Sequence, residues 1–387
     1  MCDESCEFDK DYTAIVSHYI RIQKRAGRSL IYIYTDSEKY NQEAGCGLPD
    51  CKPDYSWDTL LSYNYIGDAF VAKKNALIDA INECKNHGAV DNINYYELSL
   101  IILSKCKTSD VGHIHQVLVK DIRTDSKSYR TADDGMAAFK KMILESSEIN
   151  VNIVADKHDS AVEHVHYITN EYDLVSIIIP SKDNPDILKC CLQSIRKFTK
   201  YINYEIVVVD NGSNDSNRKE YEKLVGTFEG QHHMYEKADF NFSHMCNVGA
   251  AKAKGNLLLF LNDDIEIIGQ IMKTQTGFQY LLDRQSRKVP ARLVQSFVSG
   301  LIIIQHVGVI NYESSCFAHL YAKAVDDENI KAHKNYADYD CLCVTGACFM
   351  IEKAKFDKAG GFDEAFEVTH NDVDICLTLY EQGITMS

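Results

Sequence analysis

The sequence predicts an α/β fold whose second half is built on an open, mostly parallel sheet. Three apolar stretches each run into a polar, turn-forming cluster and then into a helix-like stretch: LVSIIIPSKDN (174–184), EIVVVDNGSND (205–215) and LLLFLNDDIE (257–266). In open α/β sheets, ligands bind at the carboxyl ends of the parallel strands. We therefore expect one crevice lined by the ends of these strands, at Pro180, Ser181, Asp210, Asp263 and Asp264.

Composition excludes several classes of protein. A chain of 387 residues that is 45% hydrophobic and 25% charged is typical of globular proteins and has room for two or three domains. Its net charge of −15 argues against a nucleic-acid partner, because binding to phosphates requires a basic face. No run is long and apolar enough to span a bilayer. The acidic start, MCDESCEFDKDY, does not resemble a secretory signal.

The 14 cysteines are scattered and show no paired CxxC spacing. This pattern disfavours a zinc site and favours reduced thiols in the cytoplasm. The histidine pairs His232-His233 and His164/His166 are interpreted as solvent-facing.

The first half of the chain predicts a helix, a strand, a mixed segment, a second helix and a short strand. In order, these are YTAIVSHYIRIQKRAG (12–27), SLIYIYTDSEKY (29–40), residues 51–81, NYYELSLIILS (94–104) and HIHQVLVKDI (113–122). A short helix is expected at MAAFKKMILESS (136–147). The acidic residues from 145 to 173 show little periodicity, and we interpret them as a connecting segment.

The second half predicts helices after each of its strands. They fall at PDILKCCLQSIRKF (185–198), SNRKEYEKLV (216–225) and SHMCNVGAAKAK (243–254), where Gly249 and Gly255 allow close approach of helix and strand. Residues 270–300 fit neither period. Ordered structure is expected again at LIIIQHVGVI (301–310), at the β-rich CLCVTGACFMI (341–351) and at the helix VDICLTLYEQG (373–383).

Carboxylates at the predicted strand ends suggest metal-assisted chemistry. Asp263 and Asp264 are the oxygen ligands that Mg²⁺ or Mn²⁺ prefers, with substrate phosphates completing the coordination shell. Asp210 is placed to accept hydrogen bonds from a base or ribose. Asp372, just ahead of the last helix, is a candidate general base for transfer to a hydroxyl. For each, the alternative is a turn former or a helix N-cap.

These motifs together resemble the family 2 glycosyltransferases, which are inverting enzymes of the GT-A fold (Rossmann-like) that use nucleotide-diphosphate sugars. The resemblance covers most of 174–383, including FNFSHMCNVGAAKAKGNLLLFLNDDIE, VTGACFMI and GGFDEAFEVTHNDVDICLTLYEQG. It implies that residues 174–387 form a GT-A domain truncated at its C-terminus, that the chain is a fragment, and that residues 270–300 and the last few residues are out-of-frame translation.

The resemblance also implies a role for each matching residue. Pro180, Ser181, Asp183, Asp210, Asn247 and Asp263 would bind the nucleotide sugar, and Asn262-Asp263-Asp264 would occupy the DxD position with Asp264 on the metal. Asp372 would be the catalytic base. Gly346, Ala347 and Asn371 would border the acceptor.

The first half is similar to the acceptor-side portion of the N-terminal copy in tandem, rhamnosyltransferase-like enzymes of bacterial surface-polysaccharide and cell-wall synthesis. This implies a partial, degenerate GT-A copy over 1–129, joined by a linker with a short helix over 130–173. Tyr95 stands where the base would be expected and Lys120 where a metal-binding His would be. We interpret this copy as catalytically inactive.

Several functions stay open at this point. The first is metal-assisted sugar transfer with inversion, from a nucleotide-diphosphate sugar to a saccharide or lipid-linked saccharide, in the cytoplasm or at the inner face of the membrane as a peripheral protein. The second is a non-catalytic module that keeps the crevice. A nucleotidyltransferase has less support, since no basic, Gly-rich phosphate loop follows the first strand. No GxGxxG supports a dinucleotide dehydrogenase. His306 and His319 are left open between packing, acceptor wall and chemistry.

Overall fold

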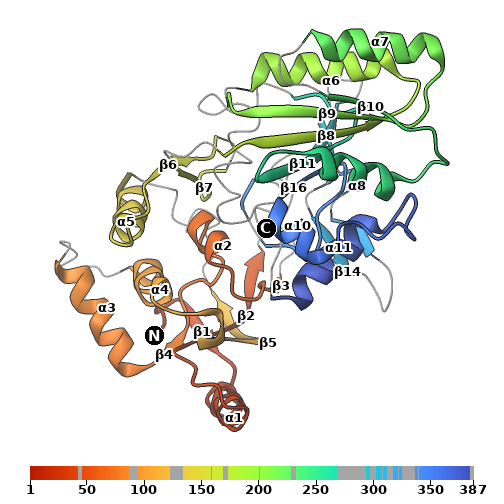
Figure 1. The fold of residues 1–387 in the computed structure, drawn as a ribbon. Coiled ribbons are helices and arrows are strands. Elements are labelled where there is room, and N and C mark those ends of the chain that lie inside the picture. The colour runs from red at the N-terminus through yellow and green to blue at the C-terminus, as the bar shows by residue number, and fades with distance from the viewer. Residues whose placement is uncertain are drawn as a thin grey trace. The chain divides into compact units, whose positions relative to one another are not determined.

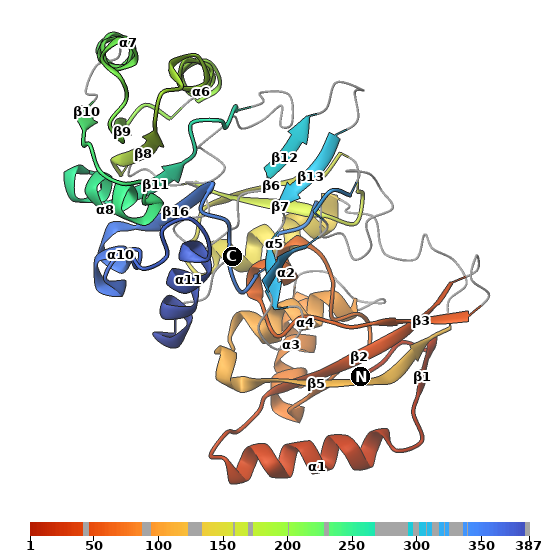
Figure 2. The same ribbon diagram turned by 90° about the vertical axis from the view of Figure 1, so that its right-hand side faces the viewer.

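The described residues of the computed structural model form two compact units. They are residues 1–41, 46–86, 94–122, 134–157, 159–168, 173–199, 201–227, 232–267, 293–296, 302–306, 308–311, 317–320, 322–324, 336–338 and 340–383. Unit 1 comprises 1–165 and 331–339, and unit 2 comprises 166–330 and 340–387. The elements of each are labelled in Figures 1 and 2. The domain limits predicted from the sequence mark two copies of one fold, whereas these two units are defined by contacts. The predicted limits therefore stay a prediction.

Unit 1 contains a five-stranded mixed sheet of order β1-β5-β2-β3, with β4 also paired to β2. Its strands are β1 (Cys6–Phe8), β2 (Tyr32–Asn41), β3 (Cys46–Asp50), β4 (Val71–Ala72) and β5 (Val111–Asp121). Only β2 and β5, the predicted strands, pair in parallel, while the other described pairings are antiparallel. A separate pair is formed by β6 (Val151–Ala155) and β7 (Glu163–Tyr167).

The helices of unit 1 are α1 (Tyr12–Arg25), α2 (Trp57–Ser62), α3 (Lys74–Asn86), α4 (Tyr95–Ser104), the 3₁₀ turn η1 (Thr108–Asp110) and α5 (Asp134–Glu145). Helix α1 buries a single residue, Val16, against Ile33, Ile114 and Leu118 of the sheet. Figure 2 shows α1 and α4 on opposite faces of this sheet. Helix α4 is apolar on nearly every side, as expected for a helix inside a core.

Unit 2 contains the predicted open, mostly parallel sheet, with order β10-β9-β8-β11-β16. Its strands are β8 (Val175–Ser181), β9 (Tyr204–Asp210), β10 (His232–Tyr235), β11 (Leu257–Leu261) and β16 (Cys348–Glu352). The first four strands in this order run parallel, and β16 is antiparallel to β11. Two small hairpin-like pairs are formed by β12 (Leu293–Ser296) with β13 (Ile302–His306) and by β14 (Val309–Asn311) with β15 (Phe317–His319).

Helices cover both faces of this sheet because successive strand residues alternate between two cores. Ile177 and Ile179 pack with α6 (Pro185–Phe198) and α7 (Asp215–Gly226). Ile178 packs with α8 (Phe242–Lys252), α10 (Lys353–Ala359) and α11 (Asn371–Glu381). Figure 1 shows α6 and α7 above the strands and α8 below them. The predicted positions of all these elements, α10 apart, are confirmed to within a few residues.

Close approach of helix and sheet is confirmed at Gly249, whereas Gly255 approaches the sheet from the loop after α8. A Cβ on Gly249 of α8 would lie 2.4 Å from Ile178 Cγ2, and one on Gly255 would lie 2.3 Å from the carbonyl oxygen of Leu174. Neither position has room for a side chain without movement of the sheet.

Residues 145–173, which we interpreted as a connecting segment, contain β6 and β7. The interpretation of His164 and His166 as solvent-facing is wrong. His164 and His166 are buried, and His164 lies 3.0 Å from a carboxylate oxygen of Asp156 and 3.6 Å from one of Asp338. The expected irregularity over 270–300 lies outside the described residues except for β12, as do residues 384–387.

Candidate active site

Four neighbouring strands of unit 2 place the predicted site residues in a row. Asp210, at the end of β9, pairs in register with Ser181 at the end of β8. The Ser181 hydroxyl donates to Asp263 Oδ2 at 2.5 Å, just beyond β11. The preceding residue, Asn262, donates its N–H to the carbonyl oxygen of Ala347 at 3.0 Å, directly before β16. With strands roughly 4.8 Å apart, the row extends over about 15 Å. The predicted convergence of strand ends is therefore present.

Ser181 belongs to a buried chain of hydrogen bonds that the sequence did not reveal. The backbone N–H of Asn184 donates to the hydroxyl oxygen of Tyr221 at 2.9 Å, and Tyr221 lies 2.7 Å from Ser181 Oγ. Because Ser181 gives its own proton to Asp263, Tyr221 is the donor to Ser181. The only sequence signal for Tyr221 is an aromatic residue in the middle of a polar helix, where it would ordinarily be assigned to packing.

Asp210 is completely buried and holds the turn that follows β9. Its Oδ1 accepts the backbone N–H of Ser213 at 2.9 Å. Its Oδ2 lies 3.2 Å from Nε2 of His233, a side chain that is 10% exposed. His233 therefore faces the site, and its interpretation as solvent-facing is wrong. Burial of a carboxylate requires such partners.

Asp183 lies on the loop after β8 in a left-handed backbone conformation (φ 52°), which is uncommon for residues other than glycine. Its Oδ1 accepts hydrogen bonds from the backbone N–H and the side chain of Asn214 and from the side chain of Asn217. The Asn214 N–H is the leading cause that lowers the pKa of Asp183. The loop is thereby tied to the start of α7, while Pro180 is buried within β8.

The two consecutive aspartates after β11 differ in environment. Asp263 is half-buried, and burial is the main cause that raises its pKa; the Ser181 hydroxyl lowers it, and the charge of Asp264 raises it further. Asp264 is exposed. Two adjacent carboxylates, one of them disfavoured as an anion by its surroundings, form a set of oxygen donors that a divalent cation would stabilise.

Asp372 lies at the other end of the row, in the first turn of α11. Its Oδ2 accepts the backbone N–H of Gly346 at 2.9 Å, and its Oδ1 accepts the N–H of Val373 at 2.9 Å. A Cβ on Gly346 would lie 3.5 Å from Asp372 Cβ, so the loop and the helix start are in contact. His370, two residues earlier, is a second non-glycine residue with positive φ (67°). Strained residues of this kind gather at functional sites.

Asn371, the predicted acceptor-side neighbour, is 4% exposed. Its side-chain oxygen accepts the backbone N–H of Asp372 at 2.8 Å. Its amide nitrogen is buried and has no hydrogen-bond partner among the described residues.

Comparison with known proteins identifies a family match for the part of the chain that carries these strand ends. Residues 176–270 match the protein family described as Glycosyl transferase family 2. They form a glycosyl transferase family 2 domain. This match spans β8, β9, β10 and β11 with their helices, and therefore includes Ser181, Asp210, Asp263 and Asp264.

Two curated bacterial proteins are similar over nearly the whole chain. The O-antigen biosynthesis protein RfbC of Myxococcus xanthus is 26% identical over 368 residues, which are 92% of this chain and 27% of that protein. An uncharacterized protein, y4gI, of Sinorhizobium fredii is 26% identical over 372 residues, which are 91% of this chain and 39% of that protein. The chain thus spans about a quarter to two fifths of the length of these relatives.

Among solved structures, GalNAc-T7 with UDP, GalNAc and Mn²⁺ is similar to the chain. The TM-score is 0.45 at 18% identity, covering 61% of this chain and 45% of that one. In the described part of the chain, no helix has the length and apolar character needed to cross a membrane.

Asn247, on α8, contacts the segment before α11 rather than the row of strand ends. Its side-chain amide donates to the carbonyl oxygen of Phe362 and to Glu364 and accepts the N–H of Phe362 at 3.0 Å. His244, one turn earlier on α8, lies 2.9 Å from Glu236 and 3.1 Å from Glu364. These contacts tie α8 to the segment before α11. The predicted contact of Asn247 with a nucleotide sugar stays a prediction.

His306 fixes the loop that carries Gly346. Its Nε2 accepts the backbone N–H of Thr345 at 3.3 Å, so the ring proton is on Nδ1, which lies 2.9 Å from Nδ1 of His319. Burial lowers the pKa of His306 to about 3, which keeps the ring neutral. Of the alternatives left open from the sequence, packing has this geometric support, because His306 is buried against the loop.

Proposed function

We propose that unit 2 transfers a sugar from a nucleotide-diphosphate donor to a hydroxyl of a saccharide or lipid-linked saccharide, with inversion and with the help of Mg²⁺ or Mn²⁺. The observation that carries this proposal is the row Asp210–Ser181–Asp263, with Asp372 reached through Ala347 and Gly346, within a family 2 domain. The relative in O-antigen biosynthesis supports a role in bacterial cell-surface polysaccharide synthesis. We place the reaction in the cytoplasm, with peripheral association at the inner face of the membrane.

Each part of the row has a distinct task in this proposal. Asp183 and Asp210 line the nucleoside pocket, Asp210 by holding the turn after β9. The buried Tyr221–Ser181 chain holds Asp263 beside the sugar nucleotide. Asp263 and Asp264 fit a hard divalent cation, which would offset the charge that builds on the departing diphosphate. No other described pair of adjacent strand-end carboxylates lies on this row.

Asp372 takes the proton of the acceptor hydroxyl. Two backbone N–H groups fix the orientation of its carboxylate, and each carboxylate oxygen keeps a further lone pair for an incoming hydroxyl. Positioned general bases contribute typically ~10²–10⁴-fold to rate. Gly346, Ala347 and Asn371 form the adjoining acceptor border.

We propose further that residues 1–129 are a non-catalytic, partial copy of the same fold. Lys120, in the place where a metal-binding histidine would be expected, lies 3.7 Å from Glu38. An ammonium group beside this acid supplies the positive charge that a metal ion would otherwise bring. Residues 130–173 join the two copies.

A screen of nucleotide sugars tests the proposal for unit 2. A true donor raises the melting temperature in the presence of Mn²⁺, since a ligand in hundredfold excess over Kd stabilises by about 2.7 kcal/mol. Release of nucleoside diphosphate, and then of glycosylated acceptor, should follow. Donor binding without turnover in any acceptor mixture would favour the non-catalytic module, and no Mn²⁺-dependent stabilisation by any nucleotide sugar would exclude both.

A further inference from the structure

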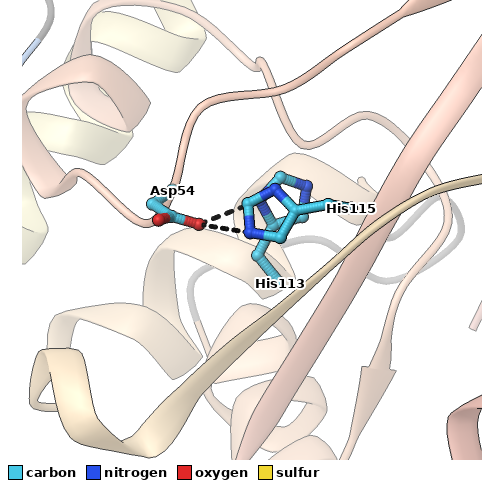
Figure 3. A group of neighbouring side chains, drawn as sticks. All are labelled: Asp54, His113 and His115. Carbon is cyan, nitrogen blue, oxygen red and sulfur yellow. Dashed lines mark hydrogen bonds and ion pairs between the residues drawn. The ribbon is translucent and has the colours of Figure 1, made fainter. Parts of the chain in front are cut away.

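Three side chains of unit 1 converge on one point, well separated in sequence from the family 2 domain. Asp54 Oδ1 lies 3.1 Å from Nδ1 of His113 and 3.3 Å from Nε2 of His115, and one ligand atom from each residue lies within 4.8 Å of the others. Figure 3 shows the Asp54 carboxylate facing the two imidazole rings. We propose that these residues bind a single divalent cation of the Zn²⁺ class.

The fold brings these residues together from two places. His113 and His115 are two positions apart on β5, so their side chains leave the same face of the strand. The register between β2 and β5 shifts just past them, where Thr35 pairs with Ile114 but Asp36 pairs with Val117. Asp54 comes from the loop between β3 and α2. The two rings lie with their centroids 4.1 Å apart.

The distances match those between ligands of a tetrahedral metal ion. With bonds of about 2.0–2.1 Å to nitrogen and oxygen, two ligand atoms of tetrahedral Zn²⁺ lie roughly 3.3 Å apart. The two separations from Asp54 Oδ1, 3.1 and 3.3 Å, are close to this length.

A buried carboxylate behind His113 sets its ring for metal binding. Nε2 of His113 lies 2.9 Å from Oδ1 of Asp36, which is 6% exposed and also accepts the backbone N–H of Lys52 at 2.9 Å. A carboxylate can only accept, so Nε2 donates its proton to Asp36; in the neutral ring this leaves the lone pair of Nδ1 facing Asp54. Metal-binding histidines are oriented in this way by a carboxylate on the opposite ring nitrogen.

Some positive charge must lie between Nδ1 of His113 and Asp54, because a lone pair and a carboxylate oxygen repel at 3.1 Å. A metal ion satisfies this need and engages His115 as well. An additional proton on His113 is the competing occupant. It would leave a nearly buried imidazolium between Asp36 and Asp54, and the test below separates the two.

The ligand set selects the class of ion. Imidazole nitrogens with one carboxylate suit Zn²⁺ and its neighbours, whereas Mg²⁺ and Mn²⁺ prefer oxygen ligands such as Asp264. The side chains of Asp54 and His115 are 77% and 67% exposed, so a fourth position is open to water. The site uses no cysteine, and cysteine spacing was the only ground on which the sequence disfavoured zinc.

The test uses the full chain without an affinity tag, stripped with a chelator and titrated with Co²⁺ as a spectroscopic substitute for Zn²⁺. We expect one Co²⁺ per chain, with the visible absorption of a four-coordinate ion, displaced by Zn²⁺ and not by Mn²⁺. His115→Ala should abolish this binding, and the exposed side chain should leave folding unchanged, as checked by circular dichroism. His18→Ala, an exposed histidine on α1, is the matched control and should bind normally.

Asp36→Asn provides a second readout. Loss of the carboxylate behind His113 should weaken Co²⁺ binding about 10–100-fold while the stoichiometry stays at one. The proposal is overturned if the unmutated chain binds no Co²⁺, if His115→Ala binds as tightly as His18→Ala, or if the bound ion shows thiolate charge-transfer absorption from cysteines. Nuclear magnetic resonance that finds protons on both ring nitrogens of His113 in saturating Zn²⁺ would also overturn it. None of these results depends on sugar transfer by unit 2.

Discussion

The hydroxyl of Ser181 donates to the carboxylate of Asp263 across 82 positions of sequence. This bond joins the ends of β8 and β11, and Tyr221 supports it from α7. The buried hydroxyl of Ser181 therefore orients Asp263, which we propose binds the sugar nucleotide.

Ser181→Ala should lower the free energy of unfolding by about 1–3 kcal/mol, because it leaves buried groups of Tyr221 and Asp263 without their partner. It should also weaken donor binding. Urea unfolding and calorimetry measure the two effects. Ser176→Ala removes another buried serine hydroxyl, which donates to Glu205 near the opposite end of β8, and is the control that should leave donor affinity unchanged.

Asp264→Ala should weaken Mn²⁺-dependent binding of the nucleotide sugar, since it removes an exposed oxygen ligand. Glu266→Ala removes an exposed acid two positions away and should have no effect. Calorimetry with and without Mn²⁺ compares the two variants. Equal affinities would remove Asp264 from the metal site.

Asp372→Asn should leave donor affinity nearly intact and reduce the rate of transfer by ~10²–10⁴-fold. The amide oxygen can still accept the Gly346 N–H, so the loop keeps its position. Asp374→Asn changes a half-buried acid on the same helix and should retain activity. Transfer at a near-normal rate in the Asp372 variant would mean that the base is another residue.

Gly249→Ala should destabilise unit 2 by about 1–3 kcal/mol, because its methyl group would press on Ile178 and Val209. Gly226→Ala is the matched helical change, since nothing lies within 4 Å of the added atom. It should be neutral or stabilising by up to about 1 kcal/mol. Urea unfolding of the two variants checks the difference, and equal midpoints would contradict the close packing of α8.

The contribution of His244 should depend on pH. A hydrogen bond to Glu236 is the main cause that raises the pKa of His244 above 6.5, and a hydrogen bond to Glu364 raises it further. A raised pKa means that the folded state binds the proton more tightly, so this stabilisation is complete below pH 6.5 and is lost as the pH rises through the folded-state value. His244→Ala should therefore lower the melting temperature more in a buffer below pH 6.5 than in one well above it. The same loss in both buffers would show that the charge of His244 has no role.

Periodicity was sufficient to predict most of the framework. The alternation of Ile177, Ile178 and Ile179 within an apolar run, followed by amphipathic helices, defines a doubly covered parallel sheet, and strand-end residues of such a sheet must converge. The contributions of Tyr221 and His233 depend on tertiary contacts between α7, β10 and the strand ends. No local pattern distinguishes them from packing or surface residues.

The cluster around His113 could not be predicted from the sequence either. HIHQVLVKDI indicates a strand, but neither Asp54 nor Asp36 is placed beside it by sequence spacing. The pairing of β2 with β5 brings Asp36 near His113, and the loop between β3 and α2 brings Asp54. His164 likewise looked exposed in an acidic stretch, and is instead buried with Asp156.

Residues 331–339 belong to unit 1, where Asp338 contacts Ser62 and His164. The polypeptide therefore crosses between the two units more than once. No single cut would release either unit whole. A limited protease that cleaves between 165 and 166 would therefore leave unit 1 dependent on the C-terminal fragment for Asp338 and its contacts with Ser62 and His164.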